Sequence, residues 1–215
     1  MIKEKIRIFE ENWKKYDEWF EHHQEIYQSE IKAIKKVIPN GLGLEIGVGT
    51  GRFASPFSVQ FGLDPSLNML LLARQRKIKI IQGVGESLPF KNESFYFILI
   101  VVTICFANNS HLFLNEAARI LKKKGELILA IIDKTSAWGR FYEAKSTQSK
   151  YYEAALFFSP EDILQMFNNI NLEYKESYQT LLQPPPDIIE IEEPRKGYGK
   201  GGFIVLKAIK KDNVA

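Results

Sequence analysis

The chain has very little cysteine and no long apolar run. Cys105 is the only cysteine, so no disulfide can form within the chain and folding needs no oxidising compartment. The longest apolar run, 95–107, is interrupted by Thr103 and is shorter than the roughly 20 residues of a membrane-spanning helix. Residues 1–15 mix charges of both signs and lack the apolar segment of a signal peptide. We therefore expect a cytoplasmic protein that does not insert into a membrane.

Charge of neither sign dominates the sequence. The chain has 29 basic and 26 acidic residues, a net charge of +3, and the basic excess falls within residues 41–133. A dedicated nucleic-acid-binding protein would need one strongly basic face, so we expect no specific nucleic-acid partner. We expect no metal site either. The length of 215 residues suits one domain with a full hydrophobic core.

The first 40 residues have a helical pattern. Apolar residues recur at helical spacing between charges from Ile2 to Ile38, which predicts helix, in two pieces. Pro39-Asn40-Gly41 combines a helix breaker, a turn residue and a glycine, and ends this region.

Strands and helices then alternate along the chain. Short apolar segments predict strands at 42–46, 59–63, 78–81, 95–102 and 126–132. Helices are expected at 52–57, 66–76 and 110–121, the last closed by Lys122-Lys123-Lys124-Gly125. Such alternation is typical of a parallel sheet that is covered on both faces.

The pattern changes after Asp133. Ser159 and Pro160 open a further helix as cap and first residue. Residues 172–182 and 203–209 are expected to form the last two strands, separated by a proline- and glycine-rich loop at 183–202. Because no helix separates these strands, the last one is expected to be antiparallel. The sequence thus predicts an α/β fold with a mostly parallel seven-stranded sheet.

A glycine-rich turn and an acidic residue lie where an open α/β sheet binds its ligand. The segment 45–51, Glu-Ile-Gly-Val-Gly-Thr-Gly, follows the first strand, and Asp64 ends the second, 19 residues after Glu45. An acid there can accept hydrogen bonds from both ribose hydroxyls of an adenosine. Arg52 stands where the dinucleotide fingerprint requires glycine, and no P-loop is present. These features favour an adenosine ligand without a pyrophosphate.

Five motifs in order resemble those of the class I S-adenosylmethionine-dependent methyltransferases, especially the ubiquinone/menaquinone-biosynthesis-like (methyltransferase type 11) branch. They are residues 44–51, 62–66, 83–90, 95–102 and 116–127. The resemblance implies a single methyltransferase domain over 1–215 with a three-layer Rossmann-like fold. Its parts would be an N-terminal helical lid at 1–40, a cofactor-binding core at 41–133, and substrate-side helices with the last two strands at 134–215. Residues 16–20, Tyr-Asp-Glu-Trp-Phe, resemble the lid of some relatives.

The resemblance also implies a set of site residues for S-adenosylmethionine, and for the product S-adenosylhomocysteine. The glycine turn would bind the methionine portion with Glu45 fixing it, Asp64 would hold the ribose, and residues 85–87 would lie beside the adenine. Thr103 and Ile104 would border the sulfonium. The full set is Glu45, Gly47, Val48, Gly49, Thr50, Gly51, Asp64, Pro65, Ser66, Met69, Gly85, Glu86, Ser87, Thr103 and Ile104.

Two positions depart from the family pattern. Relatives usually have an acidic residue where Val84 stands, and it often receives the adenine amino group; Glu86 or backbone contacts would have to replace it. Relatives also often have aspartate where Tyr96 stands, far from the cofactor, so we interpret this change as structural.

The acceptor side is less readable. The expected chemistry is direct displacement at the sulfonium methyl carbon, which needs no general base when the acceptor is already nucleophilic. His111, at the start of a helix after the fourth strand, is a candidate for substrate binding or proton transfer. Aromatic side chains, with affinity for a cation, are candidates for the acceptor pocket, although ordinary packing explains them too. They are Tyr16, Trp19, Phe20, Trp138 and Tyr142.

The leading hypothesis is a methyltransferase that acts on a nitrogen, oxygen or carbon nucleophile of a small molecule, because no basic stripe or appended recognition domain is present. One alternative is a protein that binds S-adenosylmethionine or S-adenosylhomocysteine without catalysis, which the unusual Val84 would fit. Another is a nicotinamide-dependent oxidoreductase with an irregular fingerprint, against which Arg52 counts. Turnover of the cofactor tests the first alternative, and a parallel titration with NADH tests the second.

Overall fold

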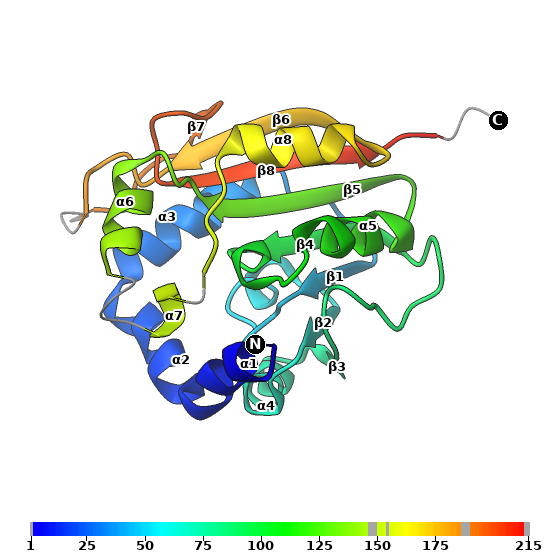
Figure 1. Ribbon diagram of the computed structural model, residues 1–215, viewed down its shortest axis with the longest axis horizontal. Coiled ribbons are helices and arrows are strands. Elements are labelled where there is room, and N and C mark those ends of the chain that lie inside the picture. Colours follow the sequence, from blue (N-terminus) through cyan, green and yellow to red (C-terminus); the bar gives the residue numbers. More distant parts are fainter. Residues whose placement is uncertain (1, 146–149, 154, 186–189, 213–215) are drawn as a thin grey trace.

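The computed structural model describes residues 2–145, 150–153, 155–185 and 190–212. They form an eight-stranded sheet in the order β3-β2-β1-β4-β5-β8-β6-β7 with helices on both faces (Figure 1). The strands are β1 Gly43–Ile46, β2 Phe61–Asp64, β3 Lys79–Gln82, β4 Phe95–Val101, β5 Leu121–Ile132, β6 Leu172–Thr180, β7 Arg195–Lys196 and β8 Phe203–Lys210. The helices are α1 Ile2–Glu11, α2 Trp13–His22, α3 Gln24–Lys35, η1 Ser55–Phe57, α4 Leu67–Gln75, η2 Ile104–Phe106, α5 Ser110–Ile120, α6 Ala137–Ala144, α7 Lys150–Glu153 and α8 Pro160–Asn168.

The sheet agrees with the predicted α/β fold. Strands β1 to β5 pair in parallel, and β8 enters antiparallel between β5 and β6. The sheet has one strand more than the seven predicted. The additional strand, β7, is a two-residue segment within the predicted loop 183–202 that pairs with Tyr178 and Gln179 of β6.

Alternate residues of the central strands supply two separate cores. Phe97, Leu99 and Val101 of β4 pack on one face with apolar residues of α3 and α4. Ile98 and Ile100 pack on the other face with residues of α5 and α8. Since side chains alternate across a strand, β4 is apolar throughout except at the exposed Tyr96.

The N-terminal region forms three helices instead of the two predicted. The helices are separated at Asn12 and His23, whose backbones are not helical. The Asn12 side-chain amide donates to the Ile8 carbonyl at 2.8 Å, and His23 Nδ1 lies 2.8 Å from the Trp19 carbonyl. Each side chain hydrogen-bonds the carbonyl that the next helical amide would otherwise use. The helix can therefore end and the chain can turn there.

The lysine run after α5 was assigned wrongly from the sequence. Helix α5 ends at Ile120, and Lys122–Lys124 belong to β5 instead of closing the helix. The lysines lie in a bulge, since Phe95 pairs with Leu121 whereas Phe97 pairs with Glu126. The bulge keeps the charges exposed while the strand beyond it is buried.

Of the predicted lid, residues 1–40, helices α1 and α2 lie at one side of the molecule, whereas α3 packs against β6 and β8. Figure 1 shows α1, α2 and α7 together there, with α4 beside α1. Within the described residues, no helix combines the length and the apolar character needed to cross a bilayer.

Candidate functional site

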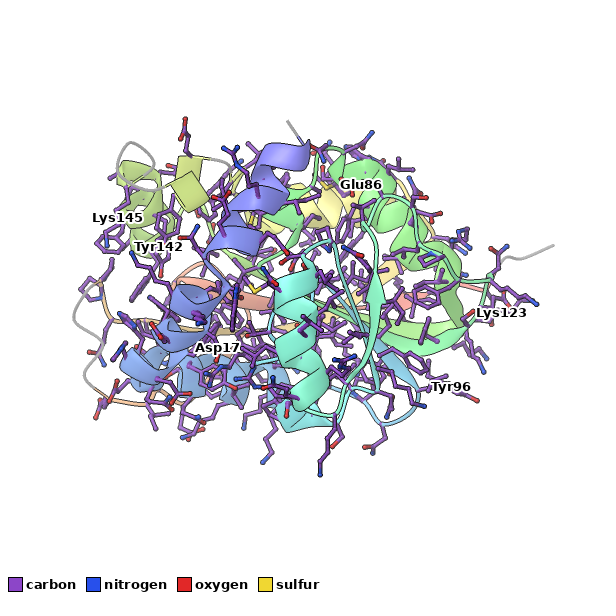
Figure 2. All side chains as sticks on the ribbon, turned by 90° about the horizontal axis from the view of Figure 1, so that it is seen from below. Asp17, Glu86, Tyr96, Lys123, Tyr142 and Lys145 are labelled. Atoms are coloured by element: carbon purple, nitrogen blue, oxygen red, sulfur yellow. The ribbon has the colours of Figure 1, made fainter. Side chains whose placement is uncertain are left out.

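A cavity of about 540 Å³ lies where β1, β2 and β4 end. The glycine turn and Asp64 line one part of it, and side chains of α1, α2, α3, α6 and α7 line the rest. Figure 2 shows Glu86 and Tyr142, both cavity residues, on opposite sides of α1. The cavity therefore extends beneath the N-terminal helices from the predicted adenine end to the predicted acceptor end.

The glycine turn has a backbone that side chains would disturb. Gly47 has a φ of +76° and Gly49 one of +52°, in the left-handed region that favours glycine. A Cβ on Gly47 would lie 2.1 Å from Thr103 Cγ2. Both glycines line the cavity, so their backbone is available for close contact with a ligand.

Asp64 is tied to the turn by two backbone hydrogen bonds. Its Oδ2 accepts from the Gly49 amide and its Oδ1 from the Ser66 amide, each at 2.9 Å. Burial raises the pKa of Asp64 to about 6, although the two hydrogen bonds oppose this and the Glu10 charge adds to it. Each carboxylate oxygen keeps a second lone pair with which it can accept a further hydrogen bond.

Glu45 lies behind the turn and does not line the cavity. It is buried, and its Oε2 atom has no hydrogen-bond partner among the described residues. Burial raises its pKa well above the usual value; a backbone hydrogen bond at Ala54 lowers it, and the Asp64 charge raises it. A buried carboxylate oxygen without a partner is costly, so a cation nearby would stabilise this arrangement.

The other predicted cofactor residues divide between cavity and core. Pro65, Ser66, Met69, Gly85, Glu86 and Thr103 line the cavity. The remainder do not: Val48 packs over Gly62, Ile104 belongs to the second core, Ser87 is exposed, and Thr50 and Gly51 are buried in the turn. Val84 also lines the cavity, next to Glu86, whose Oε1 accepts from the Asn108 amide at 2.8 Å.

Four of the five predicted acceptor-pocket aromatics line the cavity: Tyr16, Trp19, Phe20 and Tyr142. The fifth, Trp138, does not. It is buried against Gly202, and its Nε1 donates to the Gln183 carbonyl at 2.8 Å. Trp138 therefore has a packing role, the alternative that the sequence analysis left open for these aromatic residues.

The structure does not place His111 in the cavity, although Phe113, two residues further along α5, lines it. His111 itself is exposed. Tyr96 is also remote from the acceptor end; Figure 2 places it and Lys123 at the opposite side of the molecule from Asp17 and Tyr142. Tyr96 lies under the Lys122 ammonium, 3.9 Å from the ring centroid, which fits a structural role.

Several cavity residues were missed from the sequence. They include Phe53, Glu30, Tyr152 and Phe157. For Glu30 a signal existed: it lies four residues after Ile26 and four before Ile34, both buried, so an acid interrupts the apolar face of α3. Tyr152 and Phe157 lie in a segment without a clear pattern and reach the cavity only through tertiary packing.

Helix α2 is bound to the core by an ion-pair cluster. Asp17 accepts from Arg52 Nε at 2.8 Å and Arg52 Nη2 at 2.6 Å, and from Arg76 Nη2 at 2.9 Å. Burial opposes ionisation of Asp17, but the bonds from both arginines outweigh it and lower its pKa to about 2. Arg52, which interrupts the dinucleotide fingerprint, thus attaches α2 beside the glycine turn together with Arg76, whose Nη1 donates to the Thr50 carbonyl at 2.6 Å.

Helix α1 has its own anchor beside Asp64, at the start of α4. Glu10 Oε2 accepts from the Ser66 hydroxyl and, at 3.2 Å, from the Asn68 amide. A Cβ on Gly49 would also lie 3.6 Å from the Tyr16 ring, so α2 packs close to the turn itself. Both lid helices therefore contact the residues that the sequence assigned to the cofactor.

Known proteins share this arrangement. A family model described as a methyltransferase domain matches residues 44–129. An uncharacterized protein of Methanocaldococcus jannaschii is 42% identical over 205 residues, which cover 95% of this chain and 100% of that protein. A crystal structure from Thermotoga maritima, described as a SAM-dependent methyltransferase and possible histamine N-methyltransferase, is 43% identical, with a TM-score of 0.92; the match covers 95% of this chain and 99% of the other.

A more distant relative is the demethylmenaquinone methyltransferase of Staphylococcus aureus, which is 23% identical over 218 residues, covering 94% of this chain and 85% of the enzyme. The matched segment 44–129 contains the glycine turn, Asp64 and residues 85–87, and the match to the Thermotoga maritima structure covers most of the chain. The chain belongs to the S-adenosylmethionine-dependent methyltransferases.

Proposed function

We propose that this enzyme transfers the methyl group of S-adenosylmethionine to a small molecule that binds in the aromatic part of the cavity. One observation carries the proposal: a single cavity is lined both by the turn joined to Asp64 and by the ring cluster of the lid and α6. Donor and acceptor can therefore lie side by side in one cavity.

The residues present fit the cofactor. Asp64 has lone pairs left for ribose hydroxyls, and the glycine turn leaves room for the methionine portion. The partnerless Glu45 Oε2 would be stabilised by the positive charge of an amino-acid ammonium nearby. Val84, Met69 and Phe113 supply apolar surface for a purine. When bound, the cofactor supplies an electrophilic methyl carbon on a sulfonium.

The chain's own contribution is position and exclusion of water. Asp64 fixes the turn and Thr103 connects it to β4, since the Thr103 hydroxyl lies 3.0 Å from the Val101 carbonyl and 3.3 Å from that of Gly47. The α1 and α2 helices cover the cavity with apolar and aromatic side chains, including Ile6, Phe9 and Trp19. A covered, dry site strengthens electrostatic interactions and limits competing hydrolysis.

The test is a turnover assay with a panel of small acceptors. Amines, alcohols, phenols and thiols with apolar bodies are incubated with the enzyme and S-adenosylmethionine, and mass spectrometry detects methylated products. Histamine belongs in the panel because the Thermotoga maritima relative is described as a possible histamine N-methyltransferase. Product formation that is lost in Asp64→Ala supports the proposal. Binding of cofactor with no methylation of any acceptor would instead favour a non-catalytic binding protein.

A further inference from the structure

An acidic side chain lies in the aromatic part of the cavity, and the cofactor does not account for it. Glu30 projects from the buried face of α3 and lines the cavity, with only 6% of its surface exposed. It forms no hydrogen bond or ion pair with another described residue. An unpaired carboxyl is expensive to bury, so its presence here calls for a ligand that pairs with it.

Aromatic rings share the cavity with this carboxyl. Tyr16 and Phe20 of α2 contact each other with centroids 5.4 Å apart, and Tyr142 of α6 packs on Tyr152 at 4.7 Å. All four line the same cavity as Glu30. Aromatic faces attract cations, as a carboxylate does, and the ring bodies accommodate an apolar substituent.

No cation of the described cavity residues neutralises Glu30. The basic residues among them are Lys5 and Lys15; Lys15 is exposed, and Lys5 donates to the Phe106 carbonyl at 3.3 Å. The titratable groups that interact with Glu30 are tyrosines: Tyr16 from α2, Tyr142 from α6, and Tyr27 from α3 itself. The environment is thus acidic and apolar, which repels an anion and suits a cation.

We propose that Glu30 receives the nitrogen of the methyl acceptor, which makes the acceptor a small primary or secondary amine with an apolar or aromatic body. The assignment rests on the methyl transfer proposed above and names its substrate class. An alcohol or a carbon acid would bring no positive charge and would leave the buried carboxyl without an ionic partner.

Glu30 also has a place for the proton. An alkylammonium has no lone pair, so one N–H proton passes to the Glu30 carboxylate. The freed nitrogen pair then forms the new bond to the methyl carbon, and the carbon–sulfur bond breaks with its electrons going to sulfur. The product leaves with a methylated, positively charged nitrogen, and the proton on Glu30 passes to solvent. Burial raises the pKa of Glu30 to about 8, which brings it closer to that of an amine.

The test compares amines with alcohols of matched shape. Wild-type protein saturated with S-adenosylhomocysteine is titrated calorimetrically with a panel of aryl- and alkylamines and with the alcohol that corresponds to each, for example 2-phenylethylamine and 2-phenylethanol. We expect at least one amine to bind at least tenfold more tightly than its alcohol. Glu30→Gln, which keeps the shape but removes the charge, should abolish this preference.

Glu25→Gln is the matched control, because it makes the same change on the same helix outside the cavity. It should keep the amine preference. S-adenosylhomocysteine affinity is measured for all three proteins and should be equal, which separates acceptor recognition from cofactor binding. Glu30→Gln with an unchanged amine preference, or a wild type that binds or methylates alcohols but no amine, would overturn the assignment. The absence of any cofactor binding would instead refute the proposed function.

A pH profile tests the proton transfer separately. At saturating concentrations of the best amine, wild-type kcat should fall as Glu30 becomes protonated, whereas the small residual activity of Glu30→Gln should lack that limb. Superimposable profiles of the two proteins would show that Glu30 takes no proton.

Discussion

A few buried carboxyl groups determine what this cavity can hold, and Asp64 has two tasks at once. It accepts hydrogen bonds from the Gly49 and Ser66 amides, which shape the turn and start α4. Its remaining lone pairs are the proposed receptors for ribose hydroxyls. Loss of the carboxylate would therefore disturb both the ligand contact and the backbone that forms the turn.

The first prediction concerns this residue. Asp64→Ala should weaken S-adenosylhomocysteine binding by more than about tenfold, or roughly 1.4 kcal/mol, measured by isothermal titration calorimetry. Asp64→Asn keeps one acceptor oxygen and should lose less. Circular dichroism verifies that both variants are folded. Full affinity in a folded alanine variant would contradict the ribose role.

The second prediction uses the stability of Glu30 variants. Folding raises the pKa of Glu30 from its usual value of 4.5 to about 8, so the folded protein holds this proton more tightly than the unfolded chain. The group's contribution to stability is fully present below about pH 4.5 and is lost as the pH rises through 8. Glu30→Gln cannot ionise, so the variant does not lose stability in this way as the pH rises. Its melting temperature relative to wild type should rise between pH 5 and pH 9, and a constant difference would exclude the raised pKa.

A local motif made the cofactor part of the site predictable. The other cavity residues are brought there by tertiary packing, which the sequence pattern does not reveal. The turn and Asp64 are identified from sequence because adjacent parallel strands end at one edge of a sheet. Glu30 and Phe157 are far from that motif and reach the cavity through α3 and the segment before α8. Trp138 shows the converse limit: the sequence left pocket and packing open for this aromatic, and only its buried contacts distinguish the two.

At the scale of elements, the lid is held by few contacts. The ion pairs of Asp17 with Arg52 and Arg76 attach α2, and Glu10 attaches α1 to the start of α4. Phe20 of α2 adds an apolar anchor, since it is buried in the core beside Tyr27 and Phe53. Loss of the Asp17 ion pairs should therefore loosen α2, which covers the cavity, more than it destabilises the sheet.

The third prediction follows from this attachment. Asp17→Asn should lower the free energy of unfolding by about 1.5–3 kcal/mol, the range for hydrogen bonds to charged groups, and speed hydrogen exchange in α2. Because the pKa of Asp17 is lowered to about 2, the wild-type contribution is present above its usual value near 3.8 and is lost as the pH falls through 2. The difference from wild type should shrink toward pH 2.

Glu21→Gln is the control for this experiment. Glu21 also pairs with Arg52, at 2.6 Å, but its side chain is 59% exposed compared with 15% for Asp17. Exposed pairs contribute little, so this variant should leave exchange in α2 almost unchanged. Equal effects of the two substitutions would show that Asp17 is not the anchor.

Element boundaries were the weakest part of the sequence prediction. Hydrophobic periodicity located the strands of the parallel sheet and most of their helices. It placed Lys122–Lys124 at a helix end because a bulge that interrupts strand pairing leaves no periodic signal. Likewise, the breaks at Asn12 and His23 depend on side-chain hydrogen bonds that periodicity does not reveal.

For the whole molecule, the geometry distinguishes between nucleotide classes. The turn is followed only by the three-residue η1, without the long helix whose N-terminus would hold a pyrophosphate. The guanidinium of Arg52 pairs with Asp17 and Glu21. It is therefore not free to bind a phosphate group. The same features that accept an adenosine thus disfavour a dinucleotide.

The fourth prediction tests this selectivity through thermal unfolding. A ligand that binds only the folded state at 100 times its Kd adds about 2.7 kcal/mol to the free energy of unfolding. For a chain of 215 residues this corresponds to a rise in Tm of roughly 5–10 °C. S-adenosylhomocysteine should produce such a rise in wild type and a much smaller one in Asp64→Ala at the same concentration. NADH at that concentration should leave Tm unchanged in both proteins, because neither the turn nor η1 offers a place for its pyrophosphate; an NADH shift as large as that of S-adenosylhomocysteine would contradict this account of the turn.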